Sequence, residues 1–400
     1  MKIAVLGYGT VGSGVVEVLK VNKENIARRA RQEIEVKYVL DLRDFPGDPV
    51  AEILVHDYDV IVNDPEVGIV VETMGGVNPA YEYAKRALES GKSVCTSNKE
   101  LVARHGAELL ELARTKSVNF LFEASVGGGI PIIRPLNQSL TADEIEEITG
   151  ILNGTTNYIL TQMRDEGVDF ETALKDAQAK GFAERNPAAD IEGFDACRKI
   201  AILTSLTYGM QVQFEEIQTE GITKITDTDI RYADALGANI KLFASSRKVD
   251  DKVYAMVAPR MIRPNHPLFS VNGVFNAILV RGNVLGDVMF YGSGAGKLPT
   301  ASAVVSDVVD ATKHDGINIM QLWSSKKLEL ADTGSLKNQF FVRVKESDRE
   351  KAEKLFGFRE IAKLGDKTEE FAFVTDELSE KEFAEKAAQL DVIAFIRAEL

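Results

Sequence analysis

The sequence is poor in the residue types that most often build metal centres and disulfide frameworks. Its 400 residues include two cysteines, Cys95 and Cys197, and four histidines. Their positions give neither a zinc-ligand spacing nor a disulfide framework. Both cysteines lie in apolar or helical stretches, which favours a packing role over a nucleophilic one. The scattered histidines are expected to be structural or on the surface.

Basic tracts and long apolar runs are also missing. The formal net charge is −14, and no lysine-rich tract offsets it. A phosphate backbone requires clustered Lys and Arg, so we expect no nucleic-acid partner. No apolar run is long enough to span a bilayer, and Met1-Lys2-Ile3 enters a strand without the layout of a signal peptide. These features predict a cytoplasmic protein with no membrane partner.

The composition is that of a globular protein, with 45% hydrophobic and 27% charged residues. Because 400 residues exceed one compact core, we expect two or three domains.

A glycine motif follows the first predicted strand. The apolar run at residues 1–6 leads into Gly7-Tyr8-Gly9-Thr10-Val11-Gly12, and a helical pattern follows. GxGxxG at a strand-to-helix turn is the fingerprint of dinucleotide binding. The glycines permit a tight turn, and the amides at the helix N-terminus face the pyrophosphate. A purely structural glycine turn is the alternative.

Strand and helix patterns alternate over the first 125 residues, which predicts a parallel sheet covered on both faces. Ligands of such sheets bind at the carboxyl ends of the strands, so the loops at residues 73–76 and 96–99 are expected near the ligand. The expected elements are residues 35–40, 59–63, 68–72, 81–89, 93–96, 106–113 and 118–122.

The tip of the second strand leaves the choice of dinucleotide open. It reads Leu40-Asp41-Leu42-Arg43-Asp44. An acid here usually binds the ribose hydroxyls of NAD, whereas a nearby arginine favours the 2′-phosphate of NADP. Both residue types are present, and Asp41, which follows the strand directly, slightly favours NAD.

Residues 181–199 bring carboxylates and a lysine to spacings that a binding pocket can use. A helix is expected after Gly193, with Asp195 and Lys199 four residues apart on one face. Such pairs are common on surfaces, where they contribute only about 0.3–0.5 kcal/mol. The apolar run at residues 200–206, however, predicts a largely buried helix, and a buried lysine requires a partner or a task. Glu184 and Asp190, on the preceding loop, are expected to converge on the same pocket.

Further motifs complete a set that resembles a known family. They are Glu123-Ala124-Ser125-Val126-Gly127-Gly128-Gly129-Ile130, Asn153-Gly154-Thr155-Thr156-Asn157 and Tyr291-Gly292-Ser293-Gly294-Ala295-Gly296. Together with Thr96-Ser97-Asn98-Lys99 and residues 181–199, they resemble homoserine dehydrogenase. The resemblance covers roughly residues 1–325, with five signatures in the family's order. It implies interconversion of L-homoserine and L-aspartate 4-semialdehyde with NAD or NADP, in the pathway to threonine and methionine.

The resemblance also implies roles for individual residues. Lys99 would lie beside the nicotinamide, and Glu184 would contact the substrate. Asp190 and Asp195 would hold the homoserine amino group and order the site, and Lys199 would be the proton donor and acceptor. The expected cofactor-binding residues are Gly7, Gly9, Thr10, Val11, Gly12, Asp41, Arg43, Thr73, Thr96, Lys99 and Gly294.

The expected chemistry places a condition on the lysines. A lysine acts as a base only if its pKa falls, which burial and a neighbouring cation both promote. We therefore expect Lys99 and Lys199 to meet in one pocket, to lower each other's pKa and to stabilise a developing alkoxide.

The family also binds a sodium-like ion through main-chain carbonyls. By resemblance, these would belong to Glu123, Val126, Gly128 and Ile130. No residue pattern predicts such a site, because every residue carries a carbonyl oxygen.

The fold class expected is α/β, with three parts. These are a Rossmann-type dinucleotide-binding domain at 1–130, against which 300–325 packs, an α+β substrate and catalytic domain at 131–330, and a βαββαβ tail at 337–400 that resembles an ACT domain. Central strands are expected at 144–152, 240–246, 253–261 and 277–281, and helices at 158–163, 170–179 and 195–206.

The tail and the central part raise two questions about partners. The family forms a dimer through its central domain, so a homodimer or a dimer of dimers is expected. Many members respond to threonine through an ACT domain, but this tail has Glu346-Ser347-Asp348-Arg349 where a glycine usually follows the first strand. Threonine as an effector and a purely structural tail both stay open.

Two other functions are compatible with parts of the sequence. An aldehyde dehydrogenase would need Cys95 or Cys197 as a nucleophile, and no histidine is close to either in sequence. A non-catalytic dinucleotide or amino-acid sensor would not require Lys199 or Glu184.

Overall fold

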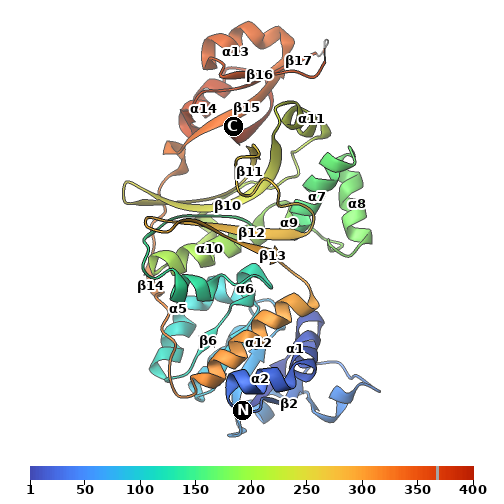
Figure 1. Ribbon diagram of the computed structural model, residues 1–400, viewed down its shortest axis with the longest axis vertical. Helices are drawn as coiled ribbons and strands as arrows, with labels where there is room; N and C mark the ends of the chain where they lie inside the picture. The colour runs from blue at the N-terminus through green and yellow to red at the C-terminus, as the bar shows by residue number, and fades with distance from the viewer. Residues whose placement is uncertain (366–368) are drawn as a thin grey trace.

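The computed structural model describes residues 1–365 and 369–400, so a short stretch of the predicted tail lies outside the described residues. The molecule is elongated, with an N-terminal layer, a large sheet in the middle and the C-terminal helices at the far end (Figure 1). Within the described ranges, no helix is both long and apolar enough to cross a membrane.

The N-terminal layer is built on six parallel strands in the order β3-β2-β1-β4-β5-β6. The first strand supplies fully buried residues to both faces of the sheet, including Ile3, Ala4 and Val5. The strand order reverses between β1 and β4, the point at which such sheets bind ligands. The predicted Rossmann-type fold is therefore confirmed. The strands are β1 Lys2–Leu6, β2 Glu35–Leu40, β3 Leu54–Val55, β4 Val67–Glu72, β5 Ser93–Thr96 and β6 Phe120–Leu121; the helices are α1 Thr10–Val21, α2 Lys23–Ala30, α3 Tyr58–Val62, α4 Ala80–Glu89, α5 Lys99–Thr115 and α6 Ala124–Gly127.

Helix α5 begins seven residues before the predicted start at residue 106. The side chain of Asn98 caps it by accepting a hydrogen bond from the Leu101 N–H, at 3.1 Å. The cap places Lys99 at the first position of the helix, three residues after the carboxyl end of β5.

Helix α12 (Lys297–Lys313) returns from the central part of the chain and packs against α1 (Figure 1). A Cβ at Gly14 would lie 2.8 Å from the Lys297 carbonyl oxygen, so the crossing requires a glycine there. An ion pair of 2.6 Å joins Lys297 to Glu17 at the same crossing. The domain boundaries themselves stay a prediction.

The middle sheet is antiparallel through β13-β12-β7-β10-β11. Helix α10 lies between this sheet and α5, so it joins the two layers. All four predicted strands are present, whereas β8, β9, β13, β14, α9 and α11 were not predicted. The strands are β7 Ile145–Ile151, β8 Met210–Gln211, β9 Gln218–Thr219, β10 Asn239–Val249, β11 Lys252–Ile262, β12 Phe275–Gly282, β13 Gly286–Ser293 and β14 Ser324–Lys327; the helices are α7 Gly154–Asp165, α8 Phe170–Ala179, α9 Ala188–Ile191, α10 Phe194–Tyr208 and α11 Asp227–Ala235.

The tail has the predicted βαββαβ topology, with its strands in the order β19-β15-β17-β16. A cluster of aromatic side chains fills its core, where the rings of Phe340 and Phe383 stack at 3.9 Å. Its last strand pairs in parallel with β11, so the tail continues the middle sheet. Its elements are β15 Lys337–Lys345, α13 Arg349–Phe356, β16 Glu360–Ala362, β17 Glu370–Val374, β18 Leu378–Ser379, α14 Glu380–Ala387 and β19 Val392–Glu399.

Candidate active site

A cavity of about 530 Å³ lies where the N-terminal layer meets the middle part of the chain. It is lined by residues from the first glycine turn, the start of α5, the α6 region, the start of α7, α10 and the loop before α12. Eight of the predicted site residues are among them: Val11, Lys99, Val126, Gly128, Asp190, Asp195, Lys199 and Gly294.

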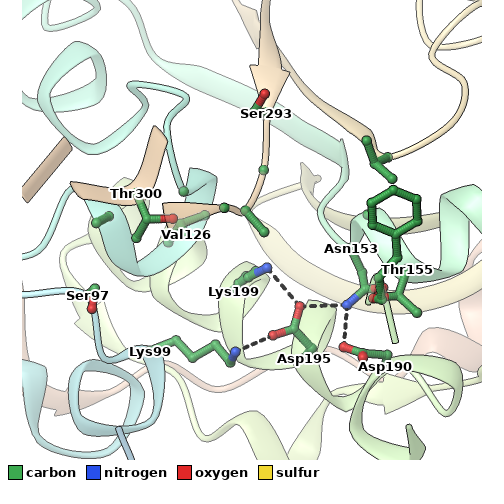
Figure 2. Close-up of a pocket in the computed structure, with 18 of the residues that line it drawn as sticks. Ser97, Lys99, Val126, Asn153, Thr155, Asp190, Asp195, Lys199, Ser293 and Thr300 are labelled. Carbon is green, nitrogen blue, oxygen red and sulfur yellow. Dashed lines mark hydrogen bonds and ion pairs between the residues drawn. The ribbon is translucent and has the colours of Figure 1, made fainter. Parts of the chain in front are cut away.

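One carboxylate joins the two lysines. Lys99 Nζ lies 2.7 Å from Oδ1 of Asp195, and Lys199 Nζ lies 2.8 Å from Oδ2 (Figure 2). The Asp195 and Lys199 side chains are 5% and 10% exposed, whereas the Lys99 side chain is 39% exposed. The three groups form a desolvated cluster that is open to solvent on the Lys99 side.

Local structure explains why α10 presents these groups together. Gly193, in the left-handed region at φ +83°, precedes the helix and turns the chain out of α9. Asp195 lies in the first turn of α10 and Lys199 lies one turn later, so both face the cavity. The spacing read from the sequence therefore gives a buried pair rather than a solvated one.

Asn153 connects the two aspartates. Its Nδ2 donates to Oδ1 of Asp190 at 2.7 Å and to Oδ2 of Asp195 at 3.0 Å (Figure 2). Its Oδ1 accepts from the Thr156 N–H as the cap of α7. Asn153 lies in one of the motifs that carry the resemblance, but the sequence predicted no role for it. An asparagine at a helix start signals a cap, but nothing in the sequence signals the second contact.

The charges fix the protonation pattern of the cluster. Burial tends to raise the pKa of Asp195, but the ammonium groups of Lys199 and Lys99 outweigh burial and hold it well below its usual range. The Asp195 carboxylate raises the pKa of Lys99 above its usual value, against the effect of burial. The prediction that the pKa of Lys99 falls is therefore wrong, because a carboxylate lies between the two cations.

Asp190 behaves differently from Asp195. Burial and the nearby Asp195 carboxylate raise the pKa of Asp190, and its hydrogen bond from Asn153 only partly offsets them. It lies in the short helix α9 rather than in the predicted loop. A bound cation would stabilise the charged form of Asp190.

Glu184 does not line the cavity. Its side chain lies in an exposed turn, and its carbonyl oxygen accepts a hydrogen bond from the Gln178 side chain at 3.1 Å. Gly181 and Phe182, earlier in the same turn, do line the cavity, so Glu184 lies near the rim.

The glycine turn after β1 is tightly packed. Gly7 has φ +89°, and a Cβ at Gly12 would lie 1.8 Å from the Gly7 carbonyl oxygen. The Thr73 hydroxyl stabilises the turn by donating to the carbonyl oxygens of Leu6 and Gly7, each at 3.0 Å. By contrast, nothing lies within 4 Å of a Cβ placed on Gly9, which precedes α1 and Thr10. The open space at Gly9 and the N–H groups at the start of α1 suit the close approach of a pyrophosphate.

Asp41 and Arg43 form a pair at the end of β2. The Arg43 guanidinium donates to both carboxylate oxygens of Asp41 at 2.9 Å, and the Tyr8 N–H donates to Oδ2 at 2.8 Å. Arg43 holds the pKa of Asp41 well below its usual range. The carboxylate is already occupied by these donors, while the Arg43 side chain is exposed.

Thr96 is fully buried and stabilises the loops that follow β4 and β5. Its hydroxyl donates to Oε2 of Glu72 at 2.6 Å and accepts from the Asn98 N–H at 2.9 Å. Glu72 also accepts hydrogen bonds from the N–H groups of Met74 and Gly75. Thr96 thus links the two loops at the sheet edge and does not line the cavity.

The proposed ion-binding stretch surrounds a buried carboxylate. Glu123 accepts hydrogen bonds from the N–H groups of Ile132, Ile133 and Arg134, at 2.6 to 2.8 Å, which fixes the turn after Ile130. Gly128 takes φ +58° and abuts the carbonyl group of Gly294. The carbonyl-lined site remains a proposal.

Asn276 is a second residue that sequence reasoning missed. It is buried beside Gly154 and Gly294, and its Oδ1 has no hydrogen-bond partner in the described part of the chain. A Cβ on Gly294 would lie 2.0 Å from Nδ2 of Asn276, so this contact requires a glycine at 294.

Neither cysteine supports a thiol mechanism. Both are buried and absent from the cavity lining, and burial raises the pKa of each thiol. A reactive cysteine requires the opposite shift.

Two family models match the chain: "Homoserine dehydrogenase, NAD binding domain" over residues 7–123 and "Homoserine dehydrogenase" over residues 131–309. The homoserine dehydrogenase of Synechocystis sp. is 48% identical over 316 residues, which cover 78% of this chain and 73% of that protein.

Solved structures agree with these matches. A crystal structure of a homoserine dehydrogenase from Thiobacillus denitrificans superposes with a TM-score of 0.92 at 36% identity, covering 100% of this chain and 98% of that one. A hyperthermophilic archaeal homoserine dehydrogenase in complex with NADPH gives a TM-score of 0.68 at 30% identity, covering 80% of this chain and 99% of that one. The chain belongs to the homoserine dehydrogenase family.

Proposed function

We propose that this protein oxidises L-homoserine reversibly to L-aspartate 4-semialdehyde, with a nicotinamide dinucleotide as the redox partner. The observation that carries the proposal is the meeting of Lys99, Lys199 and Asp195 in one cavity beside the glycine turn. Family membership supplies the substrate, and the cluster supplies the groups that its chemistry needs.

The cavity offers complementary sites for the two ends of an amino acid. Gly154 and Thr155 line it at the start of α7, where the first N–H groups of a helix lack intrahelical partners and favour an anion. Asp190 and Asp195 lie beside them and would bind an ammonium group. The substrate carboxylate and ammonium would then fix the hydroxyl near the lysines. Glu184 would join only from the rim.

Lys199 is the better placed of the two lysines to transfer a proton. It is the more buried one, and besides Asp195 it donates to the Leu152 carbonyl oxygen at 2.7 Å, which fixes its Nζ. In the oxidation, Lys199 would first release its ammonium proton to solvent and then accept the hydroxyl proton; in the reduction, its ammonium group would donate that proton. A bound nicotinamide supplies the hydride chemistry at the carbon. Lys99, held charged by Asp195, would stabilise the developing alkoxide.

The glycine turn fits a dinucleotide, and the end of β2 bears on its identity. Asp41 is engaged by Arg43 and Tyr8, whereas the Arg43 side chain is exposed and able to meet a phosphate. We propose that NADP is accepted alongside NAD, which departs from the slight preference for NAD drawn from the sequence. The sodium ion and threonine as an effector also remain proposals.

A dimer through the middle sheet is part of the same proposal. Strand β13 and the hairpin before it expose apolar side chains, namely those of Val284, Leu285, Met289 and Tyr291. An exposed apolar group of this kind suits contact with a second copy.

One assay tests the proposal. Purified protein is mixed with L-homoserine and either NAD or NADP, and formation of the reduced cofactor is followed by absorbance, with and without added threonine. Homoserine-dependent reduction that is lost in Lys199→Ala supports the proposal. Absence of reduction with both cofactors, in protein that still binds a dinucleotide, would favour the non-catalytic sensor.

A further inference from the structure

The last strand of the tail carries a buried arginine that connects the tail to the middle part of the chain. Arg397, on β19, is 2% exposed. Its guanidinium donates to both oxygens of Glu220 at 2.8 and 2.9 Å and to both oxygens of Glu380 at 2.7 and 2.8 Å. Two bidentate pairs of this kind fix the orientation of all three side chains.

Glu220 belongs to a short loop that packs on the turn between α9 and α10. The Ile222 N–H donates to the Ile191 carbonyl oxygen at 2.8 Å. A Cβ on Gly221 would lie 2.1 Å from that same oxygen and 2.4 Å from the Cα of Glu192. The two backbones are therefore in direct contact next to Glu220.

Strands β9 and β11, next to this loop, confine Gly193. A Cβ at this position would lie 3.2 Å from the Thr219 and Val257 side chains. Because Gly193 has a positive φ and begins α10, its placement sets the direction from which the helix starts. Asp190 lies three residues before this glycine and Asp195 two residues after it, so a shift of the turn moves both carboxylates of the site.

We infer that Arg397 is a positioning residue for the active site: through Glu220 it holds the α9–α10 turn and, with it, Asp190 and Asp195. The tail thus takes part in shaping the substrate pocket of the proposed dehydrogenase. This inference rests on the proposed function for its kinetic effect but not for its structural one.

The chain provides a matched control. Arg343, on β15 of the tail, is also buried, and it bridges Asp229 of α11 at 2.7 Å and Glu370 at 2.8 Å. This ion pair also joins the tail to the middle part, but it meets the start of α11, where Thr226 and Asp229 form a capping box and the Thr226 hydroxyl accepts from Arg343 at 3.2 Å, rather than the α9–α10 turn. Loss of the Arg343 ion pair should weaken the packing of the tail on the middle part without moving the α9–α10 turn.

The kinetic test compares Arg397→Met, Glu220→Gln and Arg343→Met in the full-length protein. In Arg397→Met, the KM for homoserine should rise roughly two- to thirty-fold, while the KM for the cofactor stays unchanged. Glu220→Gln should raise the KM for homoserine in the same selective way but by less, because the amide oxygen of the glutamine can still accept a hydrogen bond from Arg397. Arg343→Met should lower the unfolding temperature but leave both KM values at wild-type levels. A folded Arg397→Met protein with a wild-type KM for homoserine, or an equal shift in Arg343→Met, would overturn the inference.

Hydrogen exchange separates this inference from the proposed function. Peptides covering residues 188–196 should exchange faster in Arg397→Met and Glu220→Gln than in Arg343→Met or wild type. This result would support the inference even if the wild-type protein did not oxidise homoserine. If Arg397→Met does not fold, Glu220→Gln decides both measurements: unchanged exchange and an unchanged KM would overturn the inference.

Discussion

The Lys99 ammonium lies 2.7 Å from Oδ1 of Asp195, and this contact sets the charge of the lysine. The carboxylate raises the pKa of Lys99 and is shared with Lys199, so it keeps two cations together in a desolvated cavity. Two lysines alone would repel each other there, and each would favour its neutral form. Asp195 is therefore the centre of the cluster.

Asp195→Asn should shift the pH dependence of catalysis. Without the carboxylate, the pKa of Lys99 falls, because burial is then opposed only by the smaller effects of Asp190 and Glu100. The high-pH limb of the kcat/KM profile, which reports loss of the Lys99 proton, should move to lower pH. The maximum of kcat/KM should also be lower. Asp176→Asn is the control, since Asp176 pairs with the cavity-lining Lys180 outside the cluster. A profile that coincides with that of wild type would contradict the role of Asp195.

Lys199→Ala should lower turnover far more than it lowers cofactor affinity. Loss of positioned proton transfer is expected to reduce kcat by about 10² to 10⁴. Stopped-flow or steady-state rates with homoserine measure the first effect, and fluorescence titration with the dinucleotide measures the second. Lys180→Ala, which removes another lysine of the cavity wall, should keep most of the activity. Normal turnover in Lys199→Ala would remove the proposed role.

The fold was largely predictable because its signals are local. Short apolar runs marked the strands of the N-terminal layer, and alternation with helices implied their parallel order. Strand β13 was missed because its glycines suggested a loop. The sheet that joins the tail to β11 depends on three residue pairs, about 137 positions apart in sequence, that no local pattern marks.

Some features of the site could also be predicted from the sequence, and others could not. The i to i+4 spacing of Asp195 and Lys199 could be read from the sequence, and the family resemblance suggested by the motifs is confirmed by the comparisons. The sharing of Asp195 with Lys99, and the bridge from Asn153, are long-range contacts with no sequence signature. The predicted fall in the pKa of Lys99 failed for that reason: it counted the cations and not the carboxylate between them.

Gly9 and Gly12, two of the three glycines in the first turn, should respond differently to alanine. Gly12→Ala should destabilise the protein even without cofactor, because the Cβ would lie 1.8 Å from the Gly7 carbonyl oxygen. Gly9→Ala meets no atom within 4 Å and should leave the unfolding temperature of the free protein unchanged. It should nevertheless weaken dinucleotide binding, since its methyl group would stand where the pyrophosphate approaches. Thermal unfolding and dinucleotide titration check the pair, and equal unfolding temperatures for both variants would contradict it.

Lys241 should make stability rise with pH. It is buried on β10 and donates to the Asn157 and Asn272 side chains and to the Val271 carbonyl oxygen, at 2.6 to 3.2 Å. Burial lowers the pKa of Lys241 to about 7, below its value in the unfolded chain. Between pH 7 and about 10 the unfolded state therefore binds more protons than the folded state, so the free energy of unfolding increases with pH in this window.

The expected gain from this residue is about 2 kcal/mol between pH 7 and 9. Lys241→Met should remove this gain. The unfolding temperature of wild type minus that of the variant should therefore increase as the pH is raised. Lys248→Met is the matched control on the same strand, because Lys248 is exposed and its pairing with Asp251 raises its pKa. Parallel pH profiles of stability for wild type and Lys241→Met would show that Lys241 stays charged in the folded protein, held by its three oxygen acceptors.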